Sequence, residues 1–254
     1  MRQQERLALI LDKLAASGSV SVVDLSAELK ASAASIRRDL QTLEEQQLLK
    51  RTHGGAVAAE VIYELPMRYR AGRHQGEKRR IAEAAAELVD LSVHSVGLSG
   101  GTTTTELARL LGGAGRSLKV VTNALNIAGD LAVRSSIDLV VTGGSVRPES
   151  YELVGPIADR ALSGISLDVV FLGVDGIDAV GGISTHDEVE AQTDHCLIRT
   201  AKRVVVLTDG SKVGVRAFSR IAAIGEVHHL ITDGSADPAE LDQLRAAGVA
   251  VTLT

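Results

Sequence analysis

The sequence has little cysteine and no long apolar run, and these two absences exclude several classes of protein. Cys196 is the single cysteine, so no disulfide can form within the chain. Because no Cys or His cluster surrounds it, we predict no metal site, and we expect no cofactor. No stretch approaches the roughly 20 apolar residues of a membrane-spanning helix, and residues 1–14 are charged and periodic, unlike a signal peptide. We therefore expect no membrane association and a cytoplasmic location.

Charge is unevenly distributed along the 254 residues, whose formal net charge is -5. Residues 1–56 hold eight Lys or Arg and seven Asp or Glu, a net of +1, so the remaining residues hold -6. Any contact with nucleic acid in the N-terminal part must therefore depend on the local placement of Arg and Lys, because a bulk cationic field is lacking. The length is sufficient for about two domains.

Residues 1–46 are predicted to form three short helices. Apolar residues at helical spacing mark the first helix: Leu7, Ile10, Leu11 and Leu14. Ser21 is expected to cap a short second helix, and Ser32 a third helix that runs to about Gln46. The apolar stripe of the third helix consists of Ile36, Leu40 and Leu43. Residues 48–56 are expected to form two short strands around a tight turn.

From Lys78 onward, apolar strands alternate with helical stretches. We expect strands near 93–98, 118–122, 137–142, 167–173, 203–208, 227–232 and 249–253. We expect helices at 78–89, 104–111, 124–134, 187–201 and 237–247. Such alternation is typical of an α/β fold with a mostly parallel sheet that helices cover on both faces. The predicted organisation is a reader domain at 1–56, a linker at 57–77 and a larger domain at 78–254.

The predicted third helix has the two faces that a DNA-reading helix needs. Opposite its apolar stripe lie Ala34, Arg38 and Gln41, with Arg37 on the flank. Arg38 could pair with guanine O6 and N7, and Gln41 could pair with adenine. The candidate DNA contacts are Ser32, Ala34, Ser35, Arg37, Arg38, Gln41, Lys50, Arg51 and His53. The plainer alternative is a three-helix module whose arginines form a solvated face.

Two motifs carry a resemblance to a known family. Ser35–Ile36–Arg37–Arg38–Asp39–Leu40 and His53–Gly54–Gly55–Ala56 closely resemble the recognition helix and the wing of the DeoR family of bacterial transcription regulators. Later segments resemble the family too: Glu77–Lys78, Gly100–Gly101–Thr102–Thr103, Thr122–Asn123, Gly143–Gly144, Phe171–Leu172–Gly173, Glu190–Ala191 and Ser211–Lys212. The resemblance covers nearly the whole chain. It implies a winged helix-turn-helix, followed by a sugar-phosphate-binding domain related in fold to ribose-5-phosphate isomerase.

Three positions depart from the pattern of the family. Ser35 stands where Thr is usual, which keeps the hydroxyl, and Lys30 stands where Gly is common and could add a phosphate contact. Ser99 replaces the Asp that often precedes the Gly-Gly-Thr-Thr run. Because that change alters the hydrogen bonds offered to ligand hydroxyls, the identity of the ligand stays open.

The glycine- and threonine-rich segments are typical of an anion site. Their candidate effector contacts are Ser99, Gly100, Gly101, Thr102, Thr103, Thr104, Thr122, Asn123, Gly143 and Gly144. Bare backbone, free N–H groups at a helix start and hydroxyl donors all suit phosphate oxygens. The three loops follow three expected strands, so they can meet at one sheet edge. The alternatives are a plain turn before a Thr-capped helix, and Asn123 as a helix cap.

A phosphate in an acidic domain needs a nearby cation. Lys212, after a strand and a glycine turn, is the first candidate, and Arg147 is the second. Asp175 and Glu190 could accept hydrogen bonds from sugar hydroxyls. The alternatives are a solvated loop lysine and surface ion pairs.

Two functions from different classes remain at this stage. The resemblance implies a sequence-specific repressor of a carbohydrate operon that a phosphorylated sugar releases from operator DNA. The competing possibility is a sugar-phosphate isomerase, with Asp175, Glu190 and Lys212 as its acid and base groups. The reader domain favours regulation over catalysis, so we expect no enzyme activity. A single small reader gives limited specificity, and we therefore expect a homo-oligomer.

Overall fold

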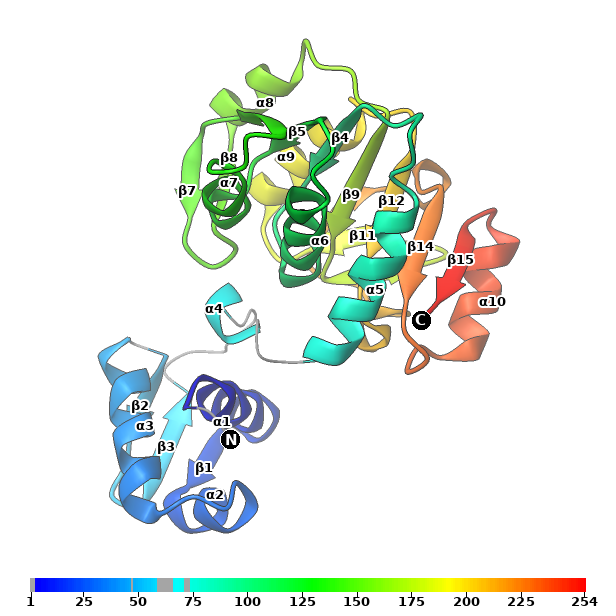
Figure 1. The fold of residues 1–254 in the computed structure, drawn as a ribbon. Helices are drawn as coiled ribbons and strands as arrows, with labels where there is room; N and C mark the ends of the chain where they lie inside the picture. The colour runs from blue at the N-terminus through cyan, green and yellow to red at the C-terminus, as the bar shows by residue number, and fades with distance from the viewer. Residues whose placement is uncertain (1–2, 47, 59–65, 71–73) are drawn as a thin grey trace. The chain divides into compact units, whose positions relative to one another are not determined.

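The computed structural model describes residues 3–46, 48–58, 66–70 and 74–254. The chain divides into two compact units, Met1–Arg73 and His74–Thr254 (Figure 1). The linker predicted at 57–77 lies in large part outside the described residues. Within that range, the structure describes the end of a strand, a one-turn helix and the start of a long helix.

The N-terminal unit is a small helical bundle with a three-stranded sheet. Its helices are α1 (Gln3–Ser17), α2 (Val22–Glu28), α3 (Ala33–Glu45) and α4 (Met67–Arg70). Its strands β1 (Ser19–Ser21), β2 (Leu49–Arg51) and β3 (Gly55–Ala58) are antiparallel, in the order β1-β3-β2. The expected hairpin, β2 and β3, is thus present, and β1 adds a third strand that the sequence pattern did not predict. A helix-turn-helix followed by a β-hairpin is the arrangement of a winged helix.

The expected capping residues and apolar stripes build this unit. The Ser21 side chain accepts a hydrogen bond from the Asp24 N–H at 3.0 Å, and Ser32 accepts one from the Ser35 N–H at 3.2 Å. These bonds satisfy backbone donors that have no partner within the helix, so they define where α2 and α3 begin. The core contains the predicted residues Leu7, Ile10, Leu11, Leu14, Ile36, Leu40 and Leu43, all buried.

Gly55 in the wing is required by the close approach of another strand. β1 pairs with β3 so that Ser21 lies opposite Gly55. A Cβ atom on Gly55 would lie 1.8 Å from the carbonyl oxygen of Val20, whereas a Cβ on Gly54 would meet no atom within 4 Å. The second glycine of the His53–Gly54–Gly55–Ala56 motif therefore allows the third strand to pair.

The C-terminal unit is built on a seven-stranded parallel sheet, as the alternation of strands and helices predicted. Its strands are β4 (Ser95–Leu98), β5 (Leu118–Thr122), β6 (Ile137–Val141), β9 (Val169–Gly173), β12 (Val204–Leu207), β14 (His229–Thr232) and β15 (Ala250–Leu253). Their order is β15-β14-β12-β9-β4-β5-β6. All seven lie within the strands expected from the sequence.

Helices cover both faces of this sheet, because its strands are apolar on both sides. The helices are α5 (Gln75–Glu87), α6 (Thr102–Gly113), α7 (Leu125–Leu131), α8 (Pro156–Leu162), α9 (Glu188–Ile198) and α10 (Pro238–Ala246). Alternate residues of β9 belong to different cores: Phe171 packs with α5, α6 and α7, and Leu172 packs with α8, α9 and α10. Figure 1 shows α5 and α6 in front of the strands and α9 behind them.

Short elements that the sequence pattern did not predict lie between these strands and helices. They are a hairpin of β7 (Ser145–Arg147) and β8 (Glu152–Val154), an antiparallel sheet of β10 (Gly176–Asp178), β11 (Gly182–Thr185) and β13 (Ser219–Ala222), and the 3-10 turns Gly210–Lys212 and Ile224–Glu226. Each has only three or four residues. The strands among them lack the apolar run, set between helical stretches, that marked the strands of the parallel sheet.

Candidate DNA-reading surface and effector site

The predicted DNA contacts of α3 lie on one accessible face. Ala34, Arg37, Arg38 and Gln41 are exposed, whereas the apolar stripe of the same helix is buried in the core. Ser32 is exposed and Ser35 is half-buried, at the N-terminal end of the helix. An exposed polar face opposite a buried apolar stripe is what insertion of a helix into the major groove requires.

The side chains on this face make weak local bonds that DNA could replace. Arg38 Nε is 3.4 Å from the carbonyl oxygen of Ala34, and Gln41 Nε2 donates to Glu45 Oε1 at 3.0 Å. Both bonds are exposed to solvent, where their net contribution to stability is small. Lys30, in the turn before α3, is also exposed, and its φ of 49° explains why glycine suits this position.

Asp39 has a structural function that the sequence analysis did not assign. Its side chain is 1% exposed, and it accepts hydrogen bonds from Arg6 Nε at 2.5 Å and Arg6 Nη2 at 3.1 Å. The hydrogen bond to Asp39 raises the pKa of Arg6. This ion pair joins α1 to α3, so the acidic residue of the Arg37–Arg38–Asp39–Leu40 motif positions the helix whose arginines face outward.

The wing carries the remaining three candidate contacts. Lys50, Arg51 and His53 are all exposed. Glu44 of α3 accepts a hydrogen bond from the Arg51 N–H at 2.9 Å, and its other carboxylate oxygen is 3.8 Å from Arg51 Nη1. This carboxylate fixes strand β2 against α3, so the wing and the helix form one surface.

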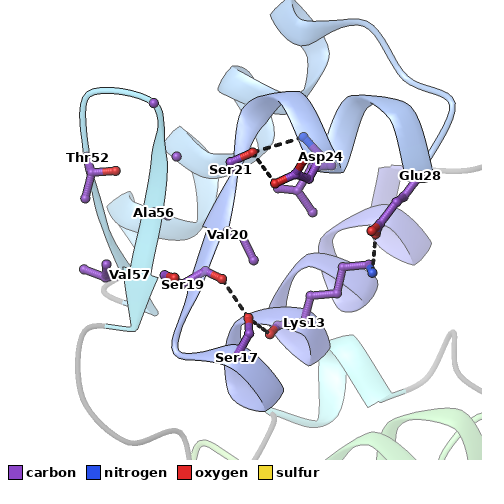
Figure 2. Close-up of a pocket in the computed structure, with 13 residues that line it drawn as sticks. Lys13, Ser17, Ser19, Val20, Ser21, Asp24, Glu28, Thr52, Ala56 and Val57 are labelled. Atoms are coloured by element: carbon purple, nitrogen blue, oxygen red, sulfur yellow. Dashed lines mark hydrogen bonds and ion pairs between the residues drawn. The ribbon is translucent and has the colours of Figure 1, made fainter.

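A hollow of about 720 Å³ lies on the same unit between α1, β1, α2 and the wing. Figure 2 shows that Ser21 bonds to Asp24 there and that Lys13 pairs with Glu28. None of the nine candidate DNA contacts lines this hollow. It is therefore a separate feature of the N-terminal unit.

In the C-terminal unit, the loops predicted to bind an effector follow three neighbouring strands. β4, β5 and β6 are adjacent and parallel, so the segments after Leu98, Thr122 and Val141 begin at the same sheet edge. Gly101, with φ 121°, starts α6, and Gly143 and Gly144 have φ 71° and 128°. Backbone turns of this kind favour glycine, because other residues rarely adopt positive φ.

Several predicted donors in these loops are already bonded to the protein. The Thr104 hydroxyl donates to the carbonyl oxygens of Gly100 and Gly101 at 2.9 Å, and the Thr122 hydroxyl donates to Leu98 O at 2.7 Å. The Ser99 hydroxyl accepts a hydrogen bond from Gly173 N at 3.1 Å. Thr103 is buried and Thr102 is half-buried at the start of α6. These hydroxyls hold the loop in place, and an effector would have to compete for them.

The predicted charged residues form a continuous network. Lys212 Nζ is 2.8 Å from Asp175 Oδ1, and Arg147 Nη1 is 3.1 Å from Glu190 Oε2. The Thr185 hydroxyl joins the two pairs, because it lies within hydrogen-bond distance of Asp175 and of Glu190. The structure therefore brings the four predicted charged residues together, each cation with an acidic partner.

Two buried carboxyl groups that the sequence analysis missed complete this network. Glu152 of β8 and Asp194 of α9 are 3% and 2% exposed. Burial, and then the charge of Glu190, raises the pKa of each well above its ordinary value. Glu152 Oε1 accepts hydrogen bonds from Gly100 N at 2.6 Å and from Asn123 Nδ2 at 3.4 Å. Asn123 thus faces the network, and the N-cap of α7 is Ala124.

The sequence contains a signal for two of the three carboxyl groups Glu152, Glu190 and Asp194. Glu190 and Asp194 are four residues apart on α9, so they lie on one side of the helix. The contribution of Glu152 comes from the β7–β8 hairpin, which no local pattern predicted.

Both parts of the chain match known protein families. Residues 6–61 match the family described as the DeoR-like helix-turn-helix domain, and residues 73–234 match the DeoR C terminal sensor domain. The chain belongs to the DeoR family. This DeoR-family chain is thus a DNA-binding transcription regulator that joins a reader domain to a sensor domain, and the predicted family and fold class are confirmed.

Curated relatives of this DeoR-family regulator match it over nearly its whole length. A protein of Escherichia coli O157:H7 named "Putative aga operon transcriptional repressor" is 36% identical and covers 98% of this chain and 93% of its own. The "HTH-type transcriptional regulator GlpR" of Haloferax volcanii is 36% identical, and the match covers 99% of this chain and 98% of that protein. The "Glycerol-3-phosphate regulon repressor" of Escherichia coli strain K12 is 31% identical and covers 92% of both chains. These relatives are named as regulators and not as enzymes.

One solved structure similar to this DeoR-family regulator is ribose 5 phosphate isomerase A from Neisseria gonorrhoeae. It has a TM-score of 0.40 and 20% identity, and the match covers 53% of this chain and 52% of that chain. The "Probable sor Operon Regulator" from Shigella flexneri has a TM-score of 0.43 and 12% identity, and covers 80% of this chain and 97% of its own. In the described part of the regulator, no helix is long and apolar enough to cross a membrane.

Proposed function

We propose that this DeoR-family regulator is a repressor of a carbohydrate-metabolism operon and that a phosphorylated sugar releases it from its operator. The observation that carries the proposal is the face of α3, where Arg37, Arg38 and Gln41 are exposed above a buried stripe. The names of the relatives support repression, and two of them are named for the aga operon and the glycerol-3-phosphate regulon. The reader is 1–56, the linker 57–77 and the sensor 78–254.

On DNA, α3 reads bases and the wing holds the backbone. Arg38 pairs with guanine in the major groove, and Gln41 reads a neighbouring base. Ser32, Ser35 and Arg37 bind phosphates near the helix start. The wing residues Lys50, Arg51 and His53 bind the flanking backbone or the minor groove, and Ala34 lies on the same reading face as Arg38.

In the sensor, the phosphate binds at the glycine loops, and Lys212 supplies the compensating charge, with Arg147 as the second cation. Both cations are paired with carboxylates in this structure. A phosphate therefore binds by exchange: it replaces Asp175 as the partner of Lys212, or Glu190 as the partner of Arg147. The carboxylate that loses its cation then accepts hydrogen bonds from sugar hydroxyls. This exchange breaks the network that joins β7, β11 and α9, so it could alter the sensor beyond the site itself.

We further propose that the regulator acts as a homo-oligomer in the cytoplasm and has no enzyme activity. Paired readers would supply the specificity that one winged helix lacks. The reader domain favours regulation over catalysis, and the relatives are named as regulators.

The test is to sequence the genomic DNA that the purified regulator retains and then to add candidate phosphosugars to the complex. We expect one enriched operator and one class of phosphosugar that releases it. Lys212→Ala should retain the operator but respond more weakly to the sugar, whereas Lys202→Ala, a lysine 78% exposed, should behave as the wild type. No enriched sequence, or turnover of the phosphosugar, would contradict the proposal.

A further inference from the structure

Three carboxyl groups of the sensor lie unusually close together in its interior. One oxygen each of Glu152, Glu190 and Asp194 lies within 4.8 Å of the others. The three side chains come from β8 and α9, and they are 3%, 5% and 2% exposed. Water cannot screen charges at this depth, so three ionised carboxylates here would repel each other strongly unless a cation or protons neutralise them.

In the described part of the sensor, the positive charge paired with this cluster is smaller than the negative charge of three ionised carboxylates. Arg147 pairs with Glu190 at 3.1 Å, and it also lies 3.7 Å from Asp187. Lys212 is paired with Asp175, whose own charge raises the pKa of Asp194. Three ionised carboxylates and one guanidinium together leave two negative charges. One divalent cation would neutralise them.

Buried oxygen atoms without a partner point to a ligand at the cluster. Among the described residues, neither Asp194 Oδ1 nor Asn123 Oδ1 has a hydrogen-bond partner. Asn123 is 1% exposed, and its amide faces the cluster, because Nδ2 lies 3.4 Å from Glu152 Oε1. A half-turn of this amide would place Oδ1 where Nδ2 now lies, next to the carboxylates. Buried oxygens without a partner are uncommon, and an ion is one explanation for them.

We propose that Glu152, Glu190 and Asp194 bind a divalent cation that prefers oxygen ligands, with Asn123 as a further ligand. Carboxylate and amide oxygens are the ligands of Mg²⁺, Ca²⁺ and Mn²⁺. Ca²⁺ binds oxygens at about 2.3–2.6 Å, so two oxygens on opposite sides of the ion are separated by up to about 5 Å. The three carboxylate oxygens lie within 4.8 Å of one another, which is inside this limit. The lack of a cysteine or histidine cluster in the sequence predicted no metal site, but a site of carboxylate and amide oxygens needs neither residue.

Protons are the competitor of the cation at this site. A carboxylate binds a cation in its ionised form, so a proton on any of the three groups competes with the cation. A cation must displace those protons, and its affinity should therefore increase with pH. Arg147, Asp187, Asp175 and Lys212 face the same network and act on this equilibrium.

This inference goes beyond the proposed function, because cation binding requires neither operator nor phosphosugar. The site nevertheless shares Asn123 and Glu190 with the proposed effector contacts, and Glu152 also bonds to the Gly100 N–H. A bound cation would hold the β7–β8 hairpin against the glycine loop.

The experiment measures binding of Mn²⁺ to the full chain after treatment with a chelator, from the paramagnetic resonance signal of free Mn²⁺ at about pH 7.5. We expect one bound ion per chain and a higher melting temperature with Mn²⁺. Glu152→Gln and Asp194→Asn should weaken binding at least about tenfold. Asp138→Asn, whose carboxylate is 64% exposed on β6, is the matched control and should bind as the wild type does.

Glutamine at position 152 keeps the shape of a protonated glutamate, so this variant is expected to fold, and circular dichroism checks that it does. Anomalous diffraction from crystals of the wild type soaked in Mn²⁺ gives a second readout that needs no variant. A peak among Glu152, Glu190 and Asp194 supports the site. No binding at millimolar Mn²⁺, or binding that Glu152→Gln leaves unchanged, would show that protons alone neutralise the cluster. Neither result depends on whether DNA or a phosphosugar binds.

Discussion

At the scale of single residues, three consecutive side chains of α3 have different functions. Asp39 is buried and paired with Arg6, whereas Arg37 and Arg38 are exposed. The sequence predicted the outward direction of the arginines, because the helical period of the apolar stripe defines the opposite face. It gave no sign that Asp39 bonds to a residue 33 positions earlier, since no local pattern encodes such a contact.

Replacement of Arg38 tests the reading face. We expect Arg38→Ala to weaken operator binding by roughly 1–3 kcal/mol and to relax the preference at one base position. Lys50→Ala should weaken binding to all sequences about equally, because a phosphate contact carries no base information. Arg79→Ala, an arginine of the sensor that is 72% exposed, is the control. A binding-site selection measures all three, and an unchanged base preference for Arg38→Ala would refute the assignment.

Replacement of Glu152 tests the buried carboxyl cluster through pH. The pKa of folded Glu152 lies well above its ordinary value of 4.5. Above about pH 4.5 the unfolded state releases this proton while the folded state retains it, so stability falls as the pH rises, by up to about 1.4 kcal/mol per pH unit. With a chelator present, Glu152→Gln should therefore lose less stability than the wild type between about pH 5 and pH 8.

Urea unfolding of both proteins across this range measures the difference. Burial lowers the pKa of His229, so this residue makes stability rise with pH. Its contribution is the same in the wild type and in Glu152→Gln, and it cancels when the two are compared. Asp168, whose pKa is lowered mainly by hydrogen bonding, affects stability only in more acidic solution. Parallel stability curves for the wild type and Glu152→Gln would mean that Glu152 is ionised in the folded protein.

At the scale of elements, the strands of the parallel sheet could be predicted, whereas those of the small antiparallel sheet and of the β7–β8 hairpin could not. The central strands β4, β9 and β12 are apolar and largely buried, because helices cover both faces of the sheet there, and helical stretches separate the strands along the chain. β1, β7, β8, β10 and β11 lack an apolar run, and pairing with another short strand forms each of them. The candidate site divides in the same way: its loops follow predicted strands, but Glu152 comes from the unpredicted β8.

The wing offers a matched pair of glycines that tests the third strand. Alanine at position 55 would place its Cβ 1.8 Å from the Val20 carbonyl oxygen, so β1 could not pair with β3 without shifting. We expect Gly55→Ala to destabilise the N-terminal unit by roughly 3 kcal/mol and to weaken operator binding. Gly54→Ala meets no atom within 4 Å and should resemble the wild type in both respects. Thermal unfolding and operator titration compare them, and equal stability of the two variants would contradict the strand pairing.

At the scale of the whole molecule, release from the operator by an effector requires coupling between the reader and the sensor. An effector can change operator affinity only if it binds the DNA-bound and the free form of the regulator with different affinity. Linkage then requires the operator to change effector affinity by the same factor as the effector changes operator affinity. For allosteric proteins this factor is typically about 5- to 150-fold.

The most direct test of this coupling is one closed thermodynamic cycle on the full chain. Operator affinity is measured with and without the phosphosugar that releases the retained DNA, and phosphosugar affinity is measured with and without the operator, all at one salt concentration. We predict that the phosphosugar weakens operator binding and that the operator weakens phosphosugar binding by an equal factor. A phosphosugar that binds the sensor tightly but leaves operator affinity unchanged would contradict the account.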